Sequence, residues 1–199
     1  MNEENQDCLS SKHKELHKHI GTGKKIRVER NFPSNPYLNG YLLELSPSLG
    51  LMHCFHDFMP DGYTVFRVAD VTECRSGKYE RHWDKMLTSE GLLSGLKIDW
   101  NVDVSNMKTA LEAISKQFQR MIIECEEQDE DDEDFYIGQI SSTGESEVHF
   151  HHFDALGHWE EVPAAILYGE ISLIQFETPY LKTFGKYLVG TPSESAKPV

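Results

Sequence analysis

The stretch GYLLELSPSLGLMHCFHDFMPDGYTVFRVADVTE, from Gly40 to Glu73, decides the expected fold, because a weaker second copy runs from Gly138 to Gln175. In each copy a glycine begins an apolar strand, a short turn containing serine follows, and a second apolar strand leads to Phe and Asp. Each copy closes on an acidic, a β-branched and a hydroxyl residue, 70–72 in the first copy and 170–172 in the second. Two weakly similar segments at this separation indicate duplication of one small β unit.

Apolar runs bounded by turn residues predict most of the strands, and residues 25–30 predict a half-buried strand because Ile26 and Val28 alternate with charged residues. In the first unit the strands cover residues 25–30, 41–45, 49–55, 63–68 and 70–74, and in the second 148–153, 164–168 and 171–176. Four or five short strands with tight turns in about fifty residues favour a small antiparallel barrel or a strongly bent sheet. The sequence therefore predicts a mostly β, α+β fold in which two small antiparallel barrel-like units are joined by helices.

Periodic apolar residues predict the helices between the units. Residues 76–93 form a short helix that carries Tyr79, Trp83 and Leu87 on one stripe, with Trp83 as a core anchor and ligand stacking as the alternative. A second helix runs from Met107 to Cys125, since its apolar residues recur at helical spacing.

The expected organisation follows from these elements. It comprises an N-terminal helical segment (1–22), a first β unit (23–75), a helical connector (76–123), an acidic linker (124–134), a second β unit (135–190) and a polar tail (191–199).

Charge is placed unevenly along the chain. The net charge is −14, and nine of the 33 acidic residues lie within ECEEQDEDDED, residues 124–134. This segment lacks the glycine and the ligand spacing of a calcium-binding loop, so we expect a solvated linker that could attract a basic protein. The excess of negative charge repels the phosphate groups of nucleic acid, so nucleic acid is not the expected partner.

Composition also indicates the compartment. The four cysteines are scattered with no CxxC pair, which favours free thiols in a reducing environment. No apolar run approaches the ~20 residues of a membrane span, and the N-terminus lacks the apolar core of a secretion signal. We therefore expect a cytoplasmic protein without a membrane partner, whose oligomeric state the sequence leaves open.

The richest concentration of possible metal ligands is VHFHHFD, residues 148–154, followed by His158. Imidazole and carboxylate groups bind zinc and iron, and His149 and His151 would project from one face of a strand. His149, His151, Asp154 and His158 are thus the candidate metal ligands, with the adjacent His152 as a possible fifth. The alternative is that the histidines lie on the solvent-exposed face of a strand, and no cofactor is then expected.

The strand and turn pattern of residues 40–72 resembles the small Sm-like or SH3-like barrels of uncharacterised bacterial proteins, and the second unit looks like a diverged tandem copy. The resemblance covers about half the chain and implies a fold rather than a chemistry. The basic or polar loop through which Sm proteins contact RNA has no matching motif here.

Three classes of function remain open. The first, which we expect, is a non-enzymatic protein-interaction or regulatory module, since no phosphate loop, nucleophile elbow or Cys/His catalytic pattern is present. The second is a metal-binding protein or metal-dependent enzyme that uses the cluster from His149 to His158. The third is Sm-like RNA binding, which rests on the resemblance alone.

Overall fold

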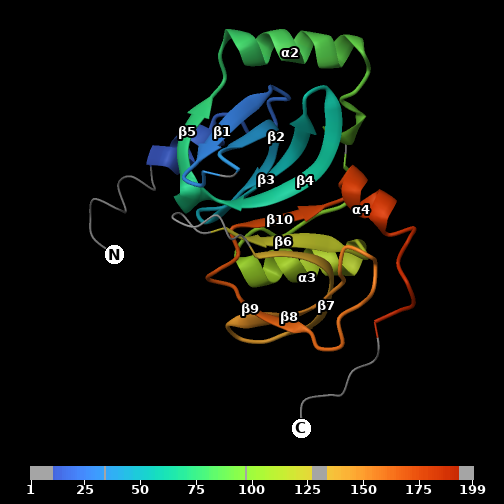
Figure 1. Ribbon diagram of the computed structural model, residues 1–199. Helices are drawn as coiled ribbons and strands as arrows, with labels where there is room; N and C mark the ends of the chain where they lie inside the picture. Colours follow the sequence, from blue (N-terminus) through green and yellow to red (C-terminus); the bar gives the residue numbers. More distant parts are fainter. Residues whose placement is uncertain (1–10, 34, 97, 127–133, 193–199) are drawn as a thin grey trace.

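The protein is built on one antiparallel sheet of ten strands. The computed structural model describes residues 11–33, 35–96, 98–126 and 134–192. The strand order is β5-β1-β2-β3-β4-β10-β6-β7-β8-β9, and Figure 1 shows the N-terminal half of this sheet curling strongly. The predicted α+β, mostly β class is confirmed, and the sheet is open, with β5 and β9 at its edges.

Each half of the chain contributes five strands. The first half supplies β1 (Ile26–Arg30), β2 (Tyr37–Leu45), β3 (Leu49–His56), β4 (Met59–Arg67), the 3-10 turn η1 (Val68–Asp70) and β5 (Val71–Arg75). The second half supplies β6 (Met121–Cys125), β7 (Asp134–Thr143), β8 (Glu147–His152), β9 (Ala164–Leu167) and β10 (Leu173–Phe176). In both halves the last strand lies next to the first, because β5 pairs with β1 and β10 pairs with β6.

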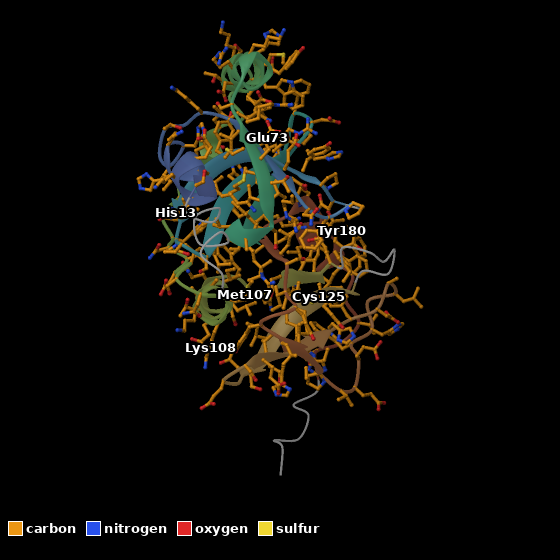
Figure 2. All side chains as sticks on the ribbon, turned by 90° about the vertical axis from the view of Figure 1, so that its left-hand side faces the viewer. His13, Glu73, Met107, Lys108, Cys125 and Tyr180 are labelled. Carbon is orange, nitrogen blue, oxygen red and sulfur yellow. The ribbon has the colours of Figure 1, made fainter. Side chains whose placement is uncertain are left out.

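Strand β10 joins the two halves into one sheet. One of its edges pairs with β6, and the other pairs with β4 of the first half, placing Ile174 opposite Val65. The largest hydrophobic core consequently contains side chains from both halves and from the helix that precedes β6; Figure 2 shows Met107 and Cys125 at the level where the halves meet. The two β units therefore share a core.

The glycines that begin the two quoted segments occupy matching positions. Gly40 on β2 lies opposite Cys54, and Gly138 on β7 lies opposite His152. A Cβ atom would lie 2.0 Å from the His53 carbonyl oxygen at Gly40 and 1.9 Å from the His151 carbonyl oxygen at Gly138. Any side chain there would force the paired backbones apart. The backbones can approach this closely only because both residues are glycine.

Helix α2 (Lys78–Ser89) confirms the first predicted helix and corrects its apolar stripe. Glu80 caps the helix by accepting the Gly77 backbone N–H at 2.7 Å, and Leu87 is fully buried. Tyr79 is 63% exposed, in contrast to its predicted place on the buried stripe, and Trp83 is half-buried. Figure 1 shows α2 crossing the top of the N-terminal half.

Helix α3 (Met107–Gln117) is shorter than predicted. Asn106 caps it by accepting the Thr109 N–H, and after Gln117 the chain turns into β6 instead of continuing as helix to Cys125. Residues 121–123 are buried and β6 is paired on both sides, so burial in the sheet overrides the helical spacing. The remaining helical segments are residues 11–17, the 3-10 turn η2 (Ser94–Leu96) and α4 (Pro179–Phe184).

Two of the first residues of the predicted acidic linker, Glu124 and Glu126, are buried, in contrast to the solvated segment that their sequence predicts. Most of it, 127–133, lies outside the described residues, but Glu124 belongs to β6, and Glu126 follows that strand with its side chain fully buried against Arg30. Their partners explain the difference, since Glu124 accepts a hydrogen bond from Gln175 and Glu126 pairs with a guanidinium. None of the described helices has the length and apolarity that crossing a membrane requires.

Candidate functional site

The predicted metal ligands on β8 have separate partners. His149 Nε2 lies 3.3 Å from Glu147 Oε1 at a half-exposed position. His151 is 3% exposed, and its Nε2 lies 2.6 Å from the Glu160 carbonyl oxygen. The two histidines thus differ in burial, and each is already engaged.

Asp154 and His158 form a surface turn. Asp154 Oδ1 accepts the backbone N–H groups of Leu156 and His158, both at 2.9 Å, and Oδ2 lies 3.6 Å from His158 Nδ1. The His158 N–H bond is the largest contribution that lowers the pKa of Asp154. Across the described ranges, no three His, Cys, Asp or Glu side chains gather around a common point that could hold a metal ion. A metal at this cluster stays a prediction for elemental analysis.

A cavity of about 500 Å³ lies between α2 and the curled N-terminal half of the sheet. Its volume is in the range of small-ligand pockets. It is lined by residues of β1, β2, β3, β5, the β3–β4 turn and α2, together with Lys25 just before β1: Lys25, Arg27, Asn39, Phe55, His56, Asp57, Arg75, Tyr79, Glu80 and Trp83.

Strand pairing places three polar side chains next to one another on the sheet surface that forms the floor of this cavity. Arg27 on β1 lies opposite Asn39 on β2 and, on the other side, opposite Arg75 on β5. Directly paired residues of antiparallel strands project from the same face of a sheet. Three polar side chains from three strands therefore stand side by side under α2.

Polar contacts hold α2 above this floor. Asp84 accepts the Tyr41 hydroxyl at 2.6 Å and the Lys25 backbone N–H at 3.0 Å, and Glu80 accepts two hydrogen bonds from Arg75. Trp83 stacks on Phe58 with ring centroids 4.5 Å apart. The helix is thus tied to the sheet by polar contacts around the cavity, in addition to the packing of its buried Leu87 against Tyr41 and Phe55.

Lys25 is the most unusual group in the cavity. The residue is only 3% exposed, and its Nζ lies 3.5 Å from Asn39 Oδ1 and 4.8 Å from the centre of the Trp83 ring. Within the described residues no carboxylate lies within 4.0 Å of this ammonium group. Burial lowers the pKa of Lys25, and the more distant charges of Glu80 and Asp84 oppose that shift. The ammonium charge is therefore poorly compensated.

Arg27 is only loosely held. Its guanidinium stacks 3.6 Å from the centre of the Tyr37 ring, and its Nε lies 3.9 Å from Glu29 Oε1, too far for a hydrogen bond. This buried Nε has no hydrogen-bond partner in the described part of the chain. Arg27 is therefore a cation of the cavity lining with one unused hydrogen-bond donor.

The lining combines positive charge with aromatic walls. Three cations face two carboxylates, those of Asp57 and Glu80, and Glu80 is occupied by Arg75. Phe55, Tyr79 and Trp83 supply the apolar surface. In a chain of net charge −14, this arrangement suits an anion with a planar apolar body.

The sequence alone did not reveal this cavity. Residues 25–30 were recognisable as a half-buried strand, so Lys25 and Arg27 were expected on its solvated face. Trp83 was considered as a ligand-stacking residue, but only as the alternative to a core anchor. The pairing of β5 with β1, which brings Arg75 and α2 to Lys25, is a long-range feature without a local signal. No family model, curated protein or solved structure matches this chain.

Proposed function

We propose that the protein is a non-enzymatic binding module whose ligand site is the cavity between α2 and the N-terminal half of the sheet. The ligand is a small anion with a planar, apolar body. One observation carries this proposal: the buried Lys25 ammonium lines the cavity, and among the residues that the structure describes no carboxylate lies within 4.0 Å of it.

The energetics favour an anionic ligand. A buried charge without a counterion costs several kcal/mol, and a charge-assisted hydrogen bond to an anion recovers about 1.5–3 kcal/mol of that. Trp83 already contacts the Lys25 ammonium and stacks on Phe58, whereas the exposed Tyr79 ring offers a flat surface on which a planar group can stack. The uncompensated charge of Lys25 and the aromatic lining thus both favour an anion with a planar group.

Calorimetric titration tests the proposal with matched probes. Phenyllactate carries a carboxylate and a phenyl ring, whereas 2-phenylethanol has the ring without the charge. We expect phenyllactate to bind and 2-phenylethanol to bind at least about tenfold more weakly, since one charge-assisted bond exceeds the 1.4 kcal/mol of a tenfold change.

Matched variants locate the binding. Lys25→Met keeps a long side chain and removes the charge, while Lys24→Met removes the same charge from the adjacent, exposed residue. The proposal predicts that phenyllactate binding falls at least about tenfold in the first variant and stays unchanged in the second. Equal affinities for both probes, or equal effects of both substitutions, would overturn it.

We also propose that the two halves are barrel-like copies of one unit. The support is the shared order of five strands, the matching glycines and a register shift shortly after each glycine. Gly40→Ala and Gly138→Ala should then destabilise the fold by similar amounts, about 1–3 kcal/mol each, because each new methyl group meets a carbonyl oxygen of the paired strand. Urea unfolding measures both values, and a loss at only one glycine would argue against equivalent positions.

An exposed apolar surface favours a second candidate function, docking of a protein partner. Phe58 and Met59 are 41% and 67% exposed beside a hollow of about 530 Å³ that also includes Met86 and Leu92. Exposed apolar patches mark interaction sites, and methionine adapts to varied partners. Met59→Lys should abolish binding of such a partner without changing the melting temperature, and an unchanged affinity would exclude this surface.

A further inference from the structure

The amine of Lys25 can do more than pair with an anion. We propose that Lys25 forms a reversible imine with anionic ligands that carry a carbonyl group, such as 2-oxo acids. This inference rests on the ligand site proposed above and names the chemical class of its ligand.

The surroundings of Nζ suit a nucleophilic amine. Its near contacts are the Asn39 amide oxygen and the face of Trp83, and the described residues place no carboxylate within ion-pair distance. Burial lowers the pKa of Lys25, the more distant Glu80 and Asp84 charges oppose this shift, and the Arg27 charge adds to it; the net lowering increases the fraction of neutral amine. Desolvation and a neighbouring cation each activate a lysine amine for attack on a carbonyl group.

The cavity also offers places for the rest of a 2-oxo acid. The carboxylate of such a molecule is bonded directly to the carbonyl carbon, so the cation that binds it must lie beside the amine. Arg27 is two residues from Lys25, and its buried Nε has no hydrogen bond within the described ranges. The side chain of the ligand would then contact Phe55, Tyr79 or Trp83.

The chemical step needs no further reactant. The nitrogen lone pair of neutral Lys25 adds to the carbonyl carbon, and the carbonyl oxygen becomes a hydroxyl by taking a proton from nitrogen. Loss of this hydroxyl with a second proton from nitrogen releases one water and leaves a carbon–nitrogen double bond. Hydrolysis reverses the step, so the ligand stays exchangeable.

Reductive trapping on the full chain tests the inference. The protein is incubated with phenylpyruvate and cyanoborohydride and then analysed by intact-mass and peptide mass spectrometry. We expect one adduct at Lys25, whose added mass equals that of phenylpyruvate less one oxygen atom. Phenyllactate, which has a hydroxyl in place of the carbonyl, should give no adduct.

Two variants separate charge from nucleophilicity. Lys25→Arg keeps a cation but lacks the reactive amine, so it should retain phenyllactate binding and lose the adduct. Lys24→Met should keep both properties, because Lys24 is exposed and lies outside the cavity lining. Thermal melting confirms that each variant is folded.

The outcomes distinguish the two proposals. Binding of phenyllactate with trapping spread evenly over exposed lysines would overturn the imine and leave the anion site standing. Absence of both binding and selective trapping would overturn both. Selective trapping at Lys25 that excess phenyllactate suppresses would support both.

Discussion

The buried ion pair between Arg30 and Glu126 connects the two halves, and removing one of its charges is expected to destabilise the protein strongly. Arg30 ends β1, Glu126 follows β6, and both side chains are fully buried. The guanidinium also lies 3.4 Å from the Asn35 carbonyl oxygen and packs over the Phe32 ring. Replacing Glu126 by Gln preserves the size of the side chain but leaves the Arg30 charge without this counterion.

The expected loss follows from the burial of both groups. Breaking a buried pair by removing one charge costs about 3–5 kcal/mol, a large part of the roughly 5–15 kcal/mol that stabilises a whole domain. For a chain of this size each kcal/mol lowers the melting temperature by about 2–4 °C, so Glu126→Gln should lower it by about 6–20 °C.

Calorimetry and urea unfolding of the full chain measure this loss. The matched variant is Arg30→Met combined with Glu126→Leu, which removes both charges and fills the space with apolar groups. It should be more stable than Glu126→Gln, because no charge remains buried alone. A loss of stability below about 1 kcal/mol for Glu126→Gln would refute the reasoning, because a loss of that size is typical of an ion pair exposed to solvent.

Two further predictions concern Tyr41 and His53. Tyr41→Phe removes the hydroxyl that donates to Asp84, and it should destabilise the protein by about 1.5–3 kcal/mol in urea unfolding, with unchanged stability contradicting the role of this bond in holding α2. Burial, with a smaller contribution from Lys182, lowers the pKa of His53 to about 4 from its usual 6.5. The unfolded chain therefore takes up the proton first as the pH falls, so stability is full above pH 6.5 and decreases by up to about 3 kcal/mol towards pH 4. His53→Gln should remove this part of the pH dependence, and an unaltered profile would assign the acid sensitivity to other groups.

Local patterns predicted most of the strands. The alternation in residues 25–30 and the apolar runs before and after the turn at 46–48 correspond to β1, β2 and β3. These segments obey short-range rules, because side-chain period and turn chemistry are contained within a few residues.

Long-range pairing could not be predicted in the same way. The place of β10 between β4 and β6 depends on which edges of two half-sheets meet, and nothing in residues 173–176 encodes that choice locally. The end of α3 differs from the prediction for a related reason: residues 121–123 fit a helical stripe, but they form a strand because β10 and β7 pair with them on both sides.

The candidate site illustrates the same limit. The residues from His149 to His158 form a predicted metal site because their ligand types are adjacent in sequence, yet His149 and His151 contact separate partners, and Asp154 contacts His158. Lys25, Arg75 and Trp83 are far apart in sequence and meet only through the pairing of β1 with β5 and the position of α2. Chemistry assembled by the fold leaves little trace in a single sequence.

The most direct test of the ligand site is a two-dimensional ¹H–¹⁵N spectrum of the protein during titration with phenyllactate. The chain has three tryptophans, and only Trp83 lines the cavity, whereas Trp100 and Trp159 lie elsewhere. We predict that the indole N–H signal of Trp83 and the backbone signals around Lys25 shift, while those of Trp100 and Trp159 stay in place. Shifts confined to Trp100 or Trp159, or none at saturating phenyllactate, would contradict a ligand site under α2.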